Sequence, residues 1–439
     1  MYHKHIHLQQ VMKHKTSIII NNLHHFFNHN HHHQQCRTIT KVRLKWVKNR
    51  SLDNIIDIHT DLKAACLLKD AIINRPITTQ FITAKSISDT QKLLGITIPT
   101  LRFIRRYPTI FDEFPHPKYP SLPCFRLTNI ALNLHKLETK IYQSQELEIV
   151  ERLCKVLMMS KDHQLPIQSI HPLRWDLGFP YDYDKTLIEK HGDKFRLVKD
   201  SNGLLCLKLV KWVDEFAVSE LQKSNEIKGL SNICYRRGEN SLGFELNFPR
   251  GYGAQKKVKT WMDEFQKLPY ISPYEDSSRI DPSSELMEKR IVGVLHEFLS
   301  LTVYKKTKRN YLRNLTDEYN MPFRFTRIFT RYPGIFYLSL KCKTTSVALK
   351  EGYKRGKLVK PCEIAKFRGK FHHVMRTGLI YRKKGLEMLP ELDKLVDDDD
   401  SIGIDENDCS GDEEIESSGE WVDHEDGDSE FDDDVSDQD

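Results

Sequence analysis

The heptapeptide RRYPTIF at residues 105–111 returns as TRYPGIF at residues 330–336, and this repeat restricts the fold more than any other feature of the chain. In the second copy, four apolar residues follow the i, i+3, i+4, i+7 spacing of one helix face: Phe325, Ile328, Phe329 and Tyr332. Pro333 ends that helix, and Pro108 ends the equivalent helix in the first copy. The matching register predicts that the chain contains the same helical unit more than once.

A weaker copy lies between these two, at residues 175–198, where Pro180, a helical stretch, His191 and Phe195 follow one another in the same order. Downstream of each copy, an alternating apolar pattern gives way to helical spacing. We therefore predict an α-rich α+β fold with about three helix-turn-helix or winged-helix-like units that carry short strands or hairpins. The aromatic pair of each copy is expected to hold the second helix against the strand that follows.

Two arginines accompany each clear copy, four residues apart on one helix face: Arg102 and Arg106 in the first, Arg327 and Arg331 in the second. Guanidinium groups one turn apart repel each other unless an anion lies between them, and a phosphate accepts two hydrogen bonds from one arginine. The pairs are therefore predicted to bind nucleic-acid phosphates. The alternative is that each arginine pairs with an acidic residue of a neighbouring element.

The charge is divided unevenly along the chain. The net charge is +6, but residues 397–439 contain 22 Asp and Glu and no Lys or Arg. The rest holds 67 Lys and Arg against 39 Asp and Glu, and this excess favours a polyanionic partner, nucleic acid or anionic lipid, over an ordinary solvated surface. Nine scattered cysteines without a C-x-x-C pair favour reduced thiols over disulfides or a zinc ribbon.

Both ends of the chain differ in composition from its middle. No Asp or Glu precedes Asp53, whereas nine Lys and Arg do, and such a segment is typical of an organellar transit peptide, placed here at residues 1–40. Its low serine content favours the mitochondrion over the chloroplast, and its histidines are interpreted as low complexity rather than as a metal site. Residues 41–390 are predicted to form the folded body, and residues 391–439 an acidic disordered tail.

The highest local density of positive charge lies late in the body. Residues 341–384 contain 14 Lys and Arg against two Glu, with Tyr353, Phe367, Phe371 and Tyr381 between them. Basic groups beside aromatic rings suit single-stranded RNA; the alternative is that the rings anchor the last helices in the core. With the cluster at residues 305–309, the candidate RNA-binding residues are Arg102, Arg106, Lys305, Lys306, Lys308, Arg309, Arg327, Arg331, Lys354, Arg355, Lys357, Arg368, Lys370 and Arg382.

The sequence holds no strong catalytic signature. GYGAQKK at residues 251–257 lacks both the third glycine of a dinucleotide fingerprint and the ending of a phosphate loop, so a tight turn is the better interpretation. Neither G-x-S-x-G nor H-E-x-x-H occurs, and His372 and His373 have no spacing that joins them to other metal ligands. We therefore predict a protein that is not an enzyme and needs no cofactor or metal. Because no apolar run is long enough to span a bilayer, no membrane partner is expected.

Six segments resemble, in order, the plant organelle RNA recognition (PORR) family: KVRLKWVKNRSLDNIIDIHTDLKAACLLKDAI, LLGITIPTLRFIRRYPTIF, FRLTNIALNLHKLE, FELNFPRGY, WMDEFQKLPYISPYE and YNMPFRFTRIFTRYPGIFYLSLK. The resemblance covers about residues 41–384, and LPYISPYE at residues 268–275 is its most distinctive part. The chain departs from the family pattern at Trp261-Met262 and in its acidic tail. The resemblance implies a plant protein, imported into mitochondria or chloroplasts, that binds organellar intron RNA and promotes group II intron splicing without catalysis, beside other splicing factors.

Two other classes of function compete with this one. An organellar DNA-binding protein of the transcription-termination type would also carry helical repeats with a Leu/Tyr-Pro phrase, but it requires a regular period near 30 residues, and the spacing here is irregular. A protein scaffold of a splicing complex would use the basic surface for partners rather than for RNA.

Overall fold

The computed structural model describes residues 39, 42, 44–76, 79–88, 90–227, 241–249, 251–253, 255–341 and 345–381. The chain divides into two compact parts, Met1–Asp397 and Asp398–Asp439, and every described residue belongs to the first part. The predicted acidic tail lies outside the described residues, as does the predicted transit peptide apart from Ile39. Among the helices described, none is both long and apolar enough to cross a bilayer.

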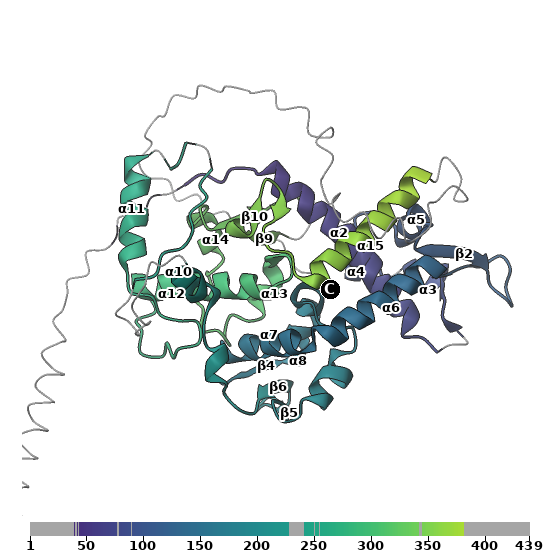
Figure 1. Ribbon diagram of the computed structural model, residues 1–439, viewed down its shortest axis with the longest axis horizontal. Helices are drawn as coiled ribbons and strands as arrows, with labels where there is room; N and C mark the ends of the chain where they lie inside the picture. The colour runs from purple at the N-terminus through teal and green to yellow at the C-terminus, as the bar shows by residue number, and fades with distance from the viewer. Residues whose placement is uncertain are drawn as a thin grey trace, which may run out of the picture. The chain divides into compact units, whose positions relative to one another are not determined.

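The described chain combines many helices with small antiparallel sheets, which confirms the predicted α-rich α+β class (Figure 1). The elements up to residue 144 are α2 (Arg50–Ile73), β1 (Ile82–Thr83), α3 (Ala84–Ser88), α4 (Gln91–Leu94), α5 (Thr100–Arg106), β2 (Phe111–Pro115), β3 (Pro123–Leu127) and α6 (Asn129–Ser144). The next are α7 (Glu146–Met158), β4 (Gln164–Pro166), α8 (Ile167–Ile170), the 3-10 turn η2 (His171–Leu173), α9 (Arg174–Leu177), the π-helix η3 (Asp184–Ile188), β5 (Phe195–Lys199) and β6 (Leu205–Leu209).

A connecting stretch then contains η4 (Asp214–Phe216), α10 (Glu220–Ile227) and α11 (Lys256–Lys267). The last group is α12 (Glu285–Leu301), β7 (Lys306–Lys308), α13 (Arg309–Arg313), α14 (Arg327–Arg331), β8 (Phe336–Ser339), β9 (Ser346–Leu349), η5 (Lys350–Gly352), β10 (Tyr353–Lys354), β11 (Lys357–Leu358) and α15 (Glu363–Tyr381).

Three small sheets share one strand order. They run β1-β3-β2, β4-β6-β5 and β7-β9-β8, so a short first strand pairs with the last strand of a hairpin each time. All these pairings are antiparallel, with Ile82 opposite Phe125, Leu165 opposite Leu207 and Thr307 opposite Val347. In chain order, each sheet is preceded by a long helix, namely α2, α7 or α12. We call the three parts of the chain from α2 to β3, from α7 to β6 and from α12 to β9 the first, second and third stretches. All three repeat one order of long helix, strand, short helices and hairpin.

The repeated aromatic phrase forms the same backbone joint in all three stretches. The carbonyl of Tyr107 accepts hydrogen bonds from the N–H groups of Ile110 and Phe111, both at 3.1 Å. The corresponding carbonyls accept from the residues three and four positions later, which are Lys194 and Phe195 for His191, and Ile335 and Phe336 for Tyr332. Each joint thereby ends a helix and starts the hairpin, as the weak middle copy in the sequence suggested.

A left-handed residue lies 12 or 13 positions before each joint. Gly95 (φ 70°) and Gly178 (φ 73°) are the C-caps of α4 and α9, whereas Asn320 (φ 52°) ends the run of turns that follows α13. Each of these residues redirects the chain toward the helix that carries the joint. Glycine and asparagine are the residues that adopt this conformation at least cost. At Gly178 the need is also steric, since a Cβ would lie 2.7 Å from Cγ2 of Val303.

One hydrophobic core connects the described stretches. Helix α15 packs on α6 and α2, so the last helix contacts the first of the three stretches. The start of α2 packs on β8, where Tyr337 Oη and Ser339 Oγ donate to Asp53 Oδ1 at 2.9 and 2.6 Å. Trp46 Nε1 donates to the carbonyl of Leu338 at 2.7 Å in the same region. The first and third stretches are therefore joined by buried polar contacts as well as by apolar packing.

Candidate nucleic-acid interface

The first joint places a cation beside a hydrogen-bonded ring and a carboxylate. Tyr107 Oη donates to Asp61 Oδ2 at 2.8 Å, and Arg106 Nη1 lies 3.9 Å from the same oxygen. Asp61 belongs to α2, the long helix of the same stretch. The joint residue thus fastens its hairpin to its own long helix, and the preceding cation is drawn to that carboxylate.

The other two joints repeat this arrangement. Tyr332 Oη and Arg331 Nη1 both donate to Oε1 of Glu288 on α12, at 2.8 and 2.7 Å. In the middle stretch the equivalent group is Glu146 of α7, with His191 at 2.7 Å and Lys190 at 2.6 Å. The hydrogen bonds from Lys190 and His191 lower the pKa of Glu146. Because all three joints use a carboxylate of the long helix, the second arginine of each predicted pair serves the joint.

The first arginine of each predicted pair is placed differently. Arg102 and Arg327 occupy the same position, five residues before the joint tyrosine, and both are exposed. Neither makes an ion pair or a side-chain hydrogen bond among the described residues. Of the four arginines, these two therefore keep guanidinium groups that are open to an external phosphate.

The strongest exposed charge cluster lies on the two-stranded hairpin of β10 and β11. Lys354 pairs in register with Lys357, and Arg355 forms the turn between them with φ of 48°. All three side chains are exposed, and the described residues supply no carboxylate partner for them. Like charges held on one short turn repel each other, so the hairpin attracts an anion. We call Lys354, Arg355 and Lys357 the basic hairpin.

The cluster at residues 305–309 is largely part of the packing of β7. Lys305 Nζ donates to the carbonyl of Ser300, and burial lowers the pKa of this lysine. Lys308 Nζ lies 5.8 Å from the centre of the Tyr311 ring. Lys306 and Arg309 are half-buried, and the Nε atom of Arg309 is buried. These four side chains present much less charge to solvent than their sequence suggests.

Arg368 is a core residue and not a surface contact. Only 1% of it is exposed, its Cζ lies 3.9 Å from the centre of the Trp175 ring, and Nη1 donates to the Trp175 carbonyl at 2.9 Å. Phe367 and Phe371 are likewise buried, so the alternative interpretation of these two rings as core anchors is confirmed. Lys370 is half-buried, and Arg382 lies outside the described residues.

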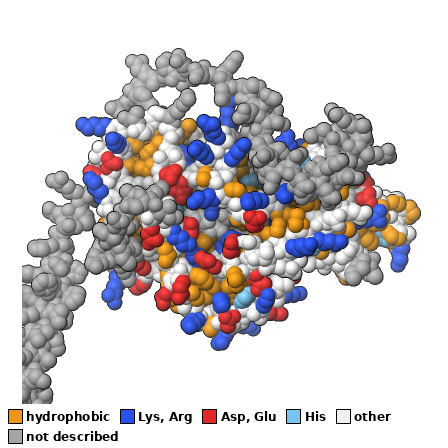
Figure 2. Space-filling model, in the orientation of Figure 1, with side chains coloured by type: hydrophobic (Ala, Val, Ile, Leu, Met, Phe, Trp, Pro, Cys, Tyr) orange, Lys and Arg blue, Asp and Glu red, His pale blue; other side chains and the backbone are white. Residues whose placement is uncertain are grey.

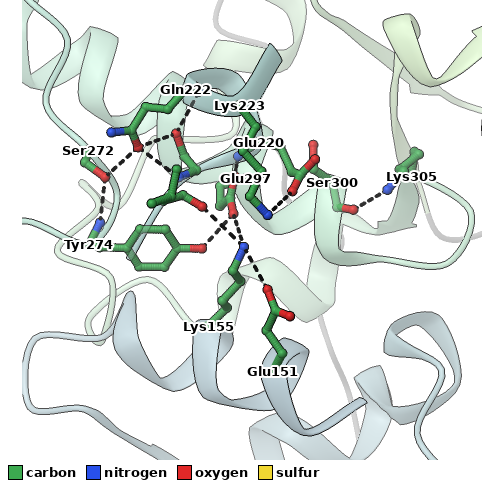
Figure 3. A network of polar contacts seen from close by, with 12 residues as sticks. Glu151, Lys155, Glu220, Gln222, Lys223, Ser272, Tyr274, Glu297, Ser300 and Lys305 are labelled. Carbon is green, nitrogen blue, oxygen red and sulfur yellow. Dashed lines mark hydrogen bonds and ion pairs between the residues drawn. The ribbon is translucent and has the colours of Figure 1, made fainter. Parts of the chain in front are cut away.

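The distinctive segment LPYISPYE supports a buried polar network between α7 and α12 (Figure 3). Tyr274 Oη donates to Glu297 Oε1 at 2.6 Å, and the N–H of Glu220 donates to Oε2 at 2.7 Å. Lys155 Nζ lies 4.0 Å from Glu297 Oε1 and donates to the carbonyl of Val218 at 3.2 Å. Burial raises the pKa of Glu297 and lowers that of Lys155.

The two charged members of this network occupy equivalent positions in their stretches. Lys155 lies eight residues before His163, and Glu297 lies eight residues before Lys305. His163 and Lys305 both have positive φ and directly precede β4 and β7. An ion pair between corresponding residues, Lys155 and Glu297, therefore links the second and third stretches.

Comparison with known proteins identifies the class of this chain. The model of the plant organelle RNA recognition domain matches residues 47–379. The chain belongs to this family. Among curated proteins of Arabidopsis thaliana, Protein WHAT'S THIS FACTOR 9, mitochondrial, is 36% identical over 80% of this chain and 89% of its own length. Protein ROOT PRIMORDIUM DEFECTIVE 1 is 29% identical over 83% of this chain and 91% of its own length.

A rice relative, Protein WHAT'S THIS FACTOR 1 homolog, chloroplastic, is 28% identical over 79% of this chain and 68% of its own length. No solved structure matches the chain significantly. The resemblance proposed from the sequence is thus confirmed, and family membership places the chain among the organellar RNA-recognition proteins. The matched region contains all three joints, the basic hairpin and the network around Glu297.

One group of potential metal ligands occurs within the described residues, formed by Asp70, His135 and Glu138. An ammonium group already contacts all three: Lys69 Nζ is 2.7 Å from Asp70 Oδ1, 3.5 Å from His135 Nδ1 and within hydrogen-bonding distance of Glu138 Oε2. Lys69 and Glu138 are both buried, so their charges require each other. The arrangement is that of a buried ion pair, and we propose no metal here.

The Lys69–Glu138 pair makes the free energy of unfolding depend on pH in the acidic range. Burial alone would raise the pKa of Glu138, but the charge of Lys69 and hydrogen bonds from His135 and Lys69 outweigh it and lower the pKa to about 2. The carboxylate is therefore fully stabilising above its ordinary pKa of 4.5, and this stabilisation, on the order of 3 kcal/mol, is lost as the pH falls toward 2. Urea unfolding at about pH 6 and pH 3 measures the change.

The matched variants for this test are Glu138→Gln and Glu113→Gln. Glu138→Gln should lose much less stability between the two pH values than the wild type does. Glu113, which pairs with Arg105 on the surface, should leave the pH dependence nearly unchanged when it is replaced. Equal pH dependence in wild type and Glu138→Gln would contradict the assignment.

The joint carboxylates permit a second stability prediction. Glu288→Ala leaves Tyr332 Oη without its acceptor in a buried site and Arg331 without its counter-ion, so the free energy of unfolding should fall by about 2 kcal/mol. Glu113→Ala removes a bidentate Arg–carboxylate pair on the surface and should cost less than about 1 kcal/mol. Chemical denaturation compares the two, and similar losses would show that the joint carboxylate has no special structural role.

Proposed function

We propose that this chain binds intron RNA in a plant organelle and promotes group II intron splicing, while the RNA itself carries out the chemistry. The match of residues 47–379 to an organellar RNA-recognition domain is the observation that carries the proposal. The protein acts by stabilising the folded intron or by preventing incorrect pairings, and it needs neither a catalytic residue nor a cofactor. Its partners are the intron RNA and other splicing factors.

The three repeated stretches act as helix-turn-helix units of winged-helix type. Their shared strand order, the left-handed turn before each joint and the hairpin after it support this assignment. In such units the helix after the turn and the hairpin face the nucleic acid. Arg102 and Arg327 lie on this helix in the first and third units, which makes them equivalent phosphate contacts. The basic hairpin adds a third contact region.

The proposal assigns a role to each of the three segments that the sequence analysis distinguished. Residues 1–40 direct import, residues 41–390 bind RNA, and residues 391–439 are an acidic tail. The mitochondrion is the favoured organelle, because the 36% identical relative is named mitochondrial while the chloroplastic relative above is 28% identical. The chloroplast is the alternative.

The experiment that tests this function is crosslinking in the plant, followed by purification of the tagged protein from both organelles and sequencing of the attached nucleic acid. Enrichment of one or a few intron RNAs from one organelle is the expected result. Recovery of organellar DNA would indicate the termination-factor class. Recovery of protein partners without RNA above background would indicate a scaffold.

A further inference from the structure

The β2–β3 hairpin, the wing of the first unit, carries a connected series of aromatic rings. The β2–β3 hairpin has the tip HPKYPSL between Pro115 and Pro123, whereas β5 and β6 are joined by DSNGL. Figure 2 shows hydrophobic side chains gathered with basic ones over this hairpin, at the right of the view. We call Phe81, Phe114, His116 and Tyr119 the aromatic wing.

The rings of the aromatic wing touch in sequence. The Phe81 ring contacts Phe114 and His116 edge-on, with centroids 5.5 and 5.8 Å away. His116 lies 5.3 Å from Tyr119 at an angle of 34°. At the other end, the Cζ atom of Arg126 lies 5.1 Å from the centre of the Phe114 ring. Aromatic and guanidinium surfaces thus form one continuous series.

The tip is held in shape by its own backbone and prolines. The N–H of His116 donates to the carbonyl of Leu122 at 3.0 Å, and that of Leu122 donates to the carbonyl of Tyr119 at 2.9 Å. His116 Nδ1 accepts from the N–H groups of Lys118 and Tyr119 at 3.1 and 3.2 Å, which fixes its ring. Four prolines at positions 115, 117, 120 and 123 restrict the chain further. A ring presented on a rigid tip loses little entropy when it binds.

The carboxylates near the wing do not oppose an anionic ligand. Arg105 Nε and Nη2 donate to both oxygens of Glu113, at 2.8 and 2.6 Å, and Arg126 Nε donates to Asp112 at 2.8 Å. A surface hollow of about 280 Å³ adjoins the rings and is lined by Glu113, Phe114, Pro115, Pro120, Ser121 and Pro123. Tyr119 precedes Pro120 of this lining in the chain and is 63% exposed, so one ring of the series is open to solvent.

We propose that the aromatic wing is a stacking site for unpaired nucleobases of the bound RNA. The inference rests on the proposed function, and it adds the kind of RNA recognised: single-stranded segments whose bases are turned away from their own helix. Exposed aromatic faces beside cations hold single strands because every base has a flat π-face. A site of this kind is tolerant of sequence and supplies affinity for loops or junctions, not for a duplex.

The test compares binding of the full chain to an unstructured oligouridine and to the same strand made of abasic nucleotides. Tyr119→Ala should weaken binding to oligouridine by about 5- to 100-fold, and Tyr119→Phe should keep it within about twofold because the ring is retained. On the abasic strand, Tyr119→Ala should bind as the wild type does. Phe323→Ala is the matched control, since Phe323 is a 93% exposed ring without an aromatic neighbour among the described residues.

A second measurement does not depend on a variant. Photocrosslinking of 4-thiouridine RNA to the wild-type protein, followed by peptide mapping, should label residues of the tip between Pro115 and Pro123. Absence of labelling there, with labelling elsewhere, overturns the inference, as does a Tyr119→Ala variant that binds oligouridine like the wild type. If that variant instead loses a co-purified protein, the wing is a protein-docking surface.

Failure of the proposed function gives a different result. In that case the wild-type chain binds neither strand, and reversal of the basic hairpin changes nothing. If the basic hairpin is required for binding while Tyr119→Ala and the crosslinks are negative, RNA binding stands and only the stacking site is refuted.

Discussion

Reversing the basic hairpin with Lys354→Glu, Arg355→Glu and Lys357→Glu should lower the affinity for single-stranded RNA by about 100-fold at about 0.1 M salt. Each phosphate contact releases counterions, and for single strands one contact changes the log-log salt slope by about 0.7, or about fivefold in affinity at this salt concentration. All three side chains are exposed, so the core should not be disturbed. If six to eight phosphates are bound in total, the wild-type slope is about −4 to −6.

The control for net charge is a second triple reversal on α11, at Lys256, Lys257 and Lys259. These lysines are also exposed, and their reversal changes the net charge by the same amount. Filter binding over a salt series should show a reduced slope for the basic hairpin variant and a smaller loss for the α11 variant. Equal losses would mean that RNA senses only the overall field of the protein. A scaffold without RNA contact predicts no effect of either variant on the slope.

The joints were predictable from sequence because their signals are local. Proline position, aromatic spacing and the order of short segments fix where a helix ends and a hairpin begins, and even the weak copy at His191 follows the same hydrogen-bond pattern. The carboxylates of the joints were not predictable. Asp61, Glu146 and Glu288 lie 44 to 46 residues before the joint residues Tyr107, His191 and Tyr332, on a separate helix, and nothing local marks them among the other acids of the chain.

The candidate RNA-binding residues also divide into those whose environment follows from local sequence and those whose environment depends on tertiary packing. Nothing in the sequence distinguishes Arg368 from its basic neighbours. Because α15 packs on α2 and α6, the Arg368 side chain is buried in the core, where it lies over the Trp175 ring and donates to the Trp175 carbonyl. Arg102 and Arg327 were grouped with Arg106 and Arg331 because helical spacing cannot reveal a tertiary ion pair. The aromatic wing was missed altogether, although the proline-spaced His116 and Tyr119 at a hairpin tip were a usable signal.

Removing the buried carboxylate with Glu297→Ala should cost about 3 to 5 kcal/mol of unfolding free energy. Glu297 is fully buried, and its loss leaves Tyr274 Oη and the N–H of Glu220 without their acceptor and removes one of the two carboxylates near the ammonium of Lys155. The change also opens a cavity between α7 and α12, which pack on each other. Urea denaturation measures the loss, and Glu363→Ala is the control, because Glu363 pairs with Lys366 on the surface and should cost less than about 1 kcal/mol.

A double-mutant cycle shows whether the charges of the second and third units act as a pair. Lys155→Met alone leaves the buried carboxylate without its cation, and Glu297→Ala alone leaves the buried ammonium with the partly exposed Glu151 as its anion, so each single change carries a desolvation cost that the double variant avoids. The double variant should therefore be more stable than the sum of the two losses predicts, by about 0.5 to 3 kcal/mol. Additive losses would indicate that Tyr274 and Glu220 hold Glu297 and that Lys155 is fastened by Val218 and Glu151 instead. In that event the two units would be joined through the LPYISPYE segment rather than by their corresponding residues.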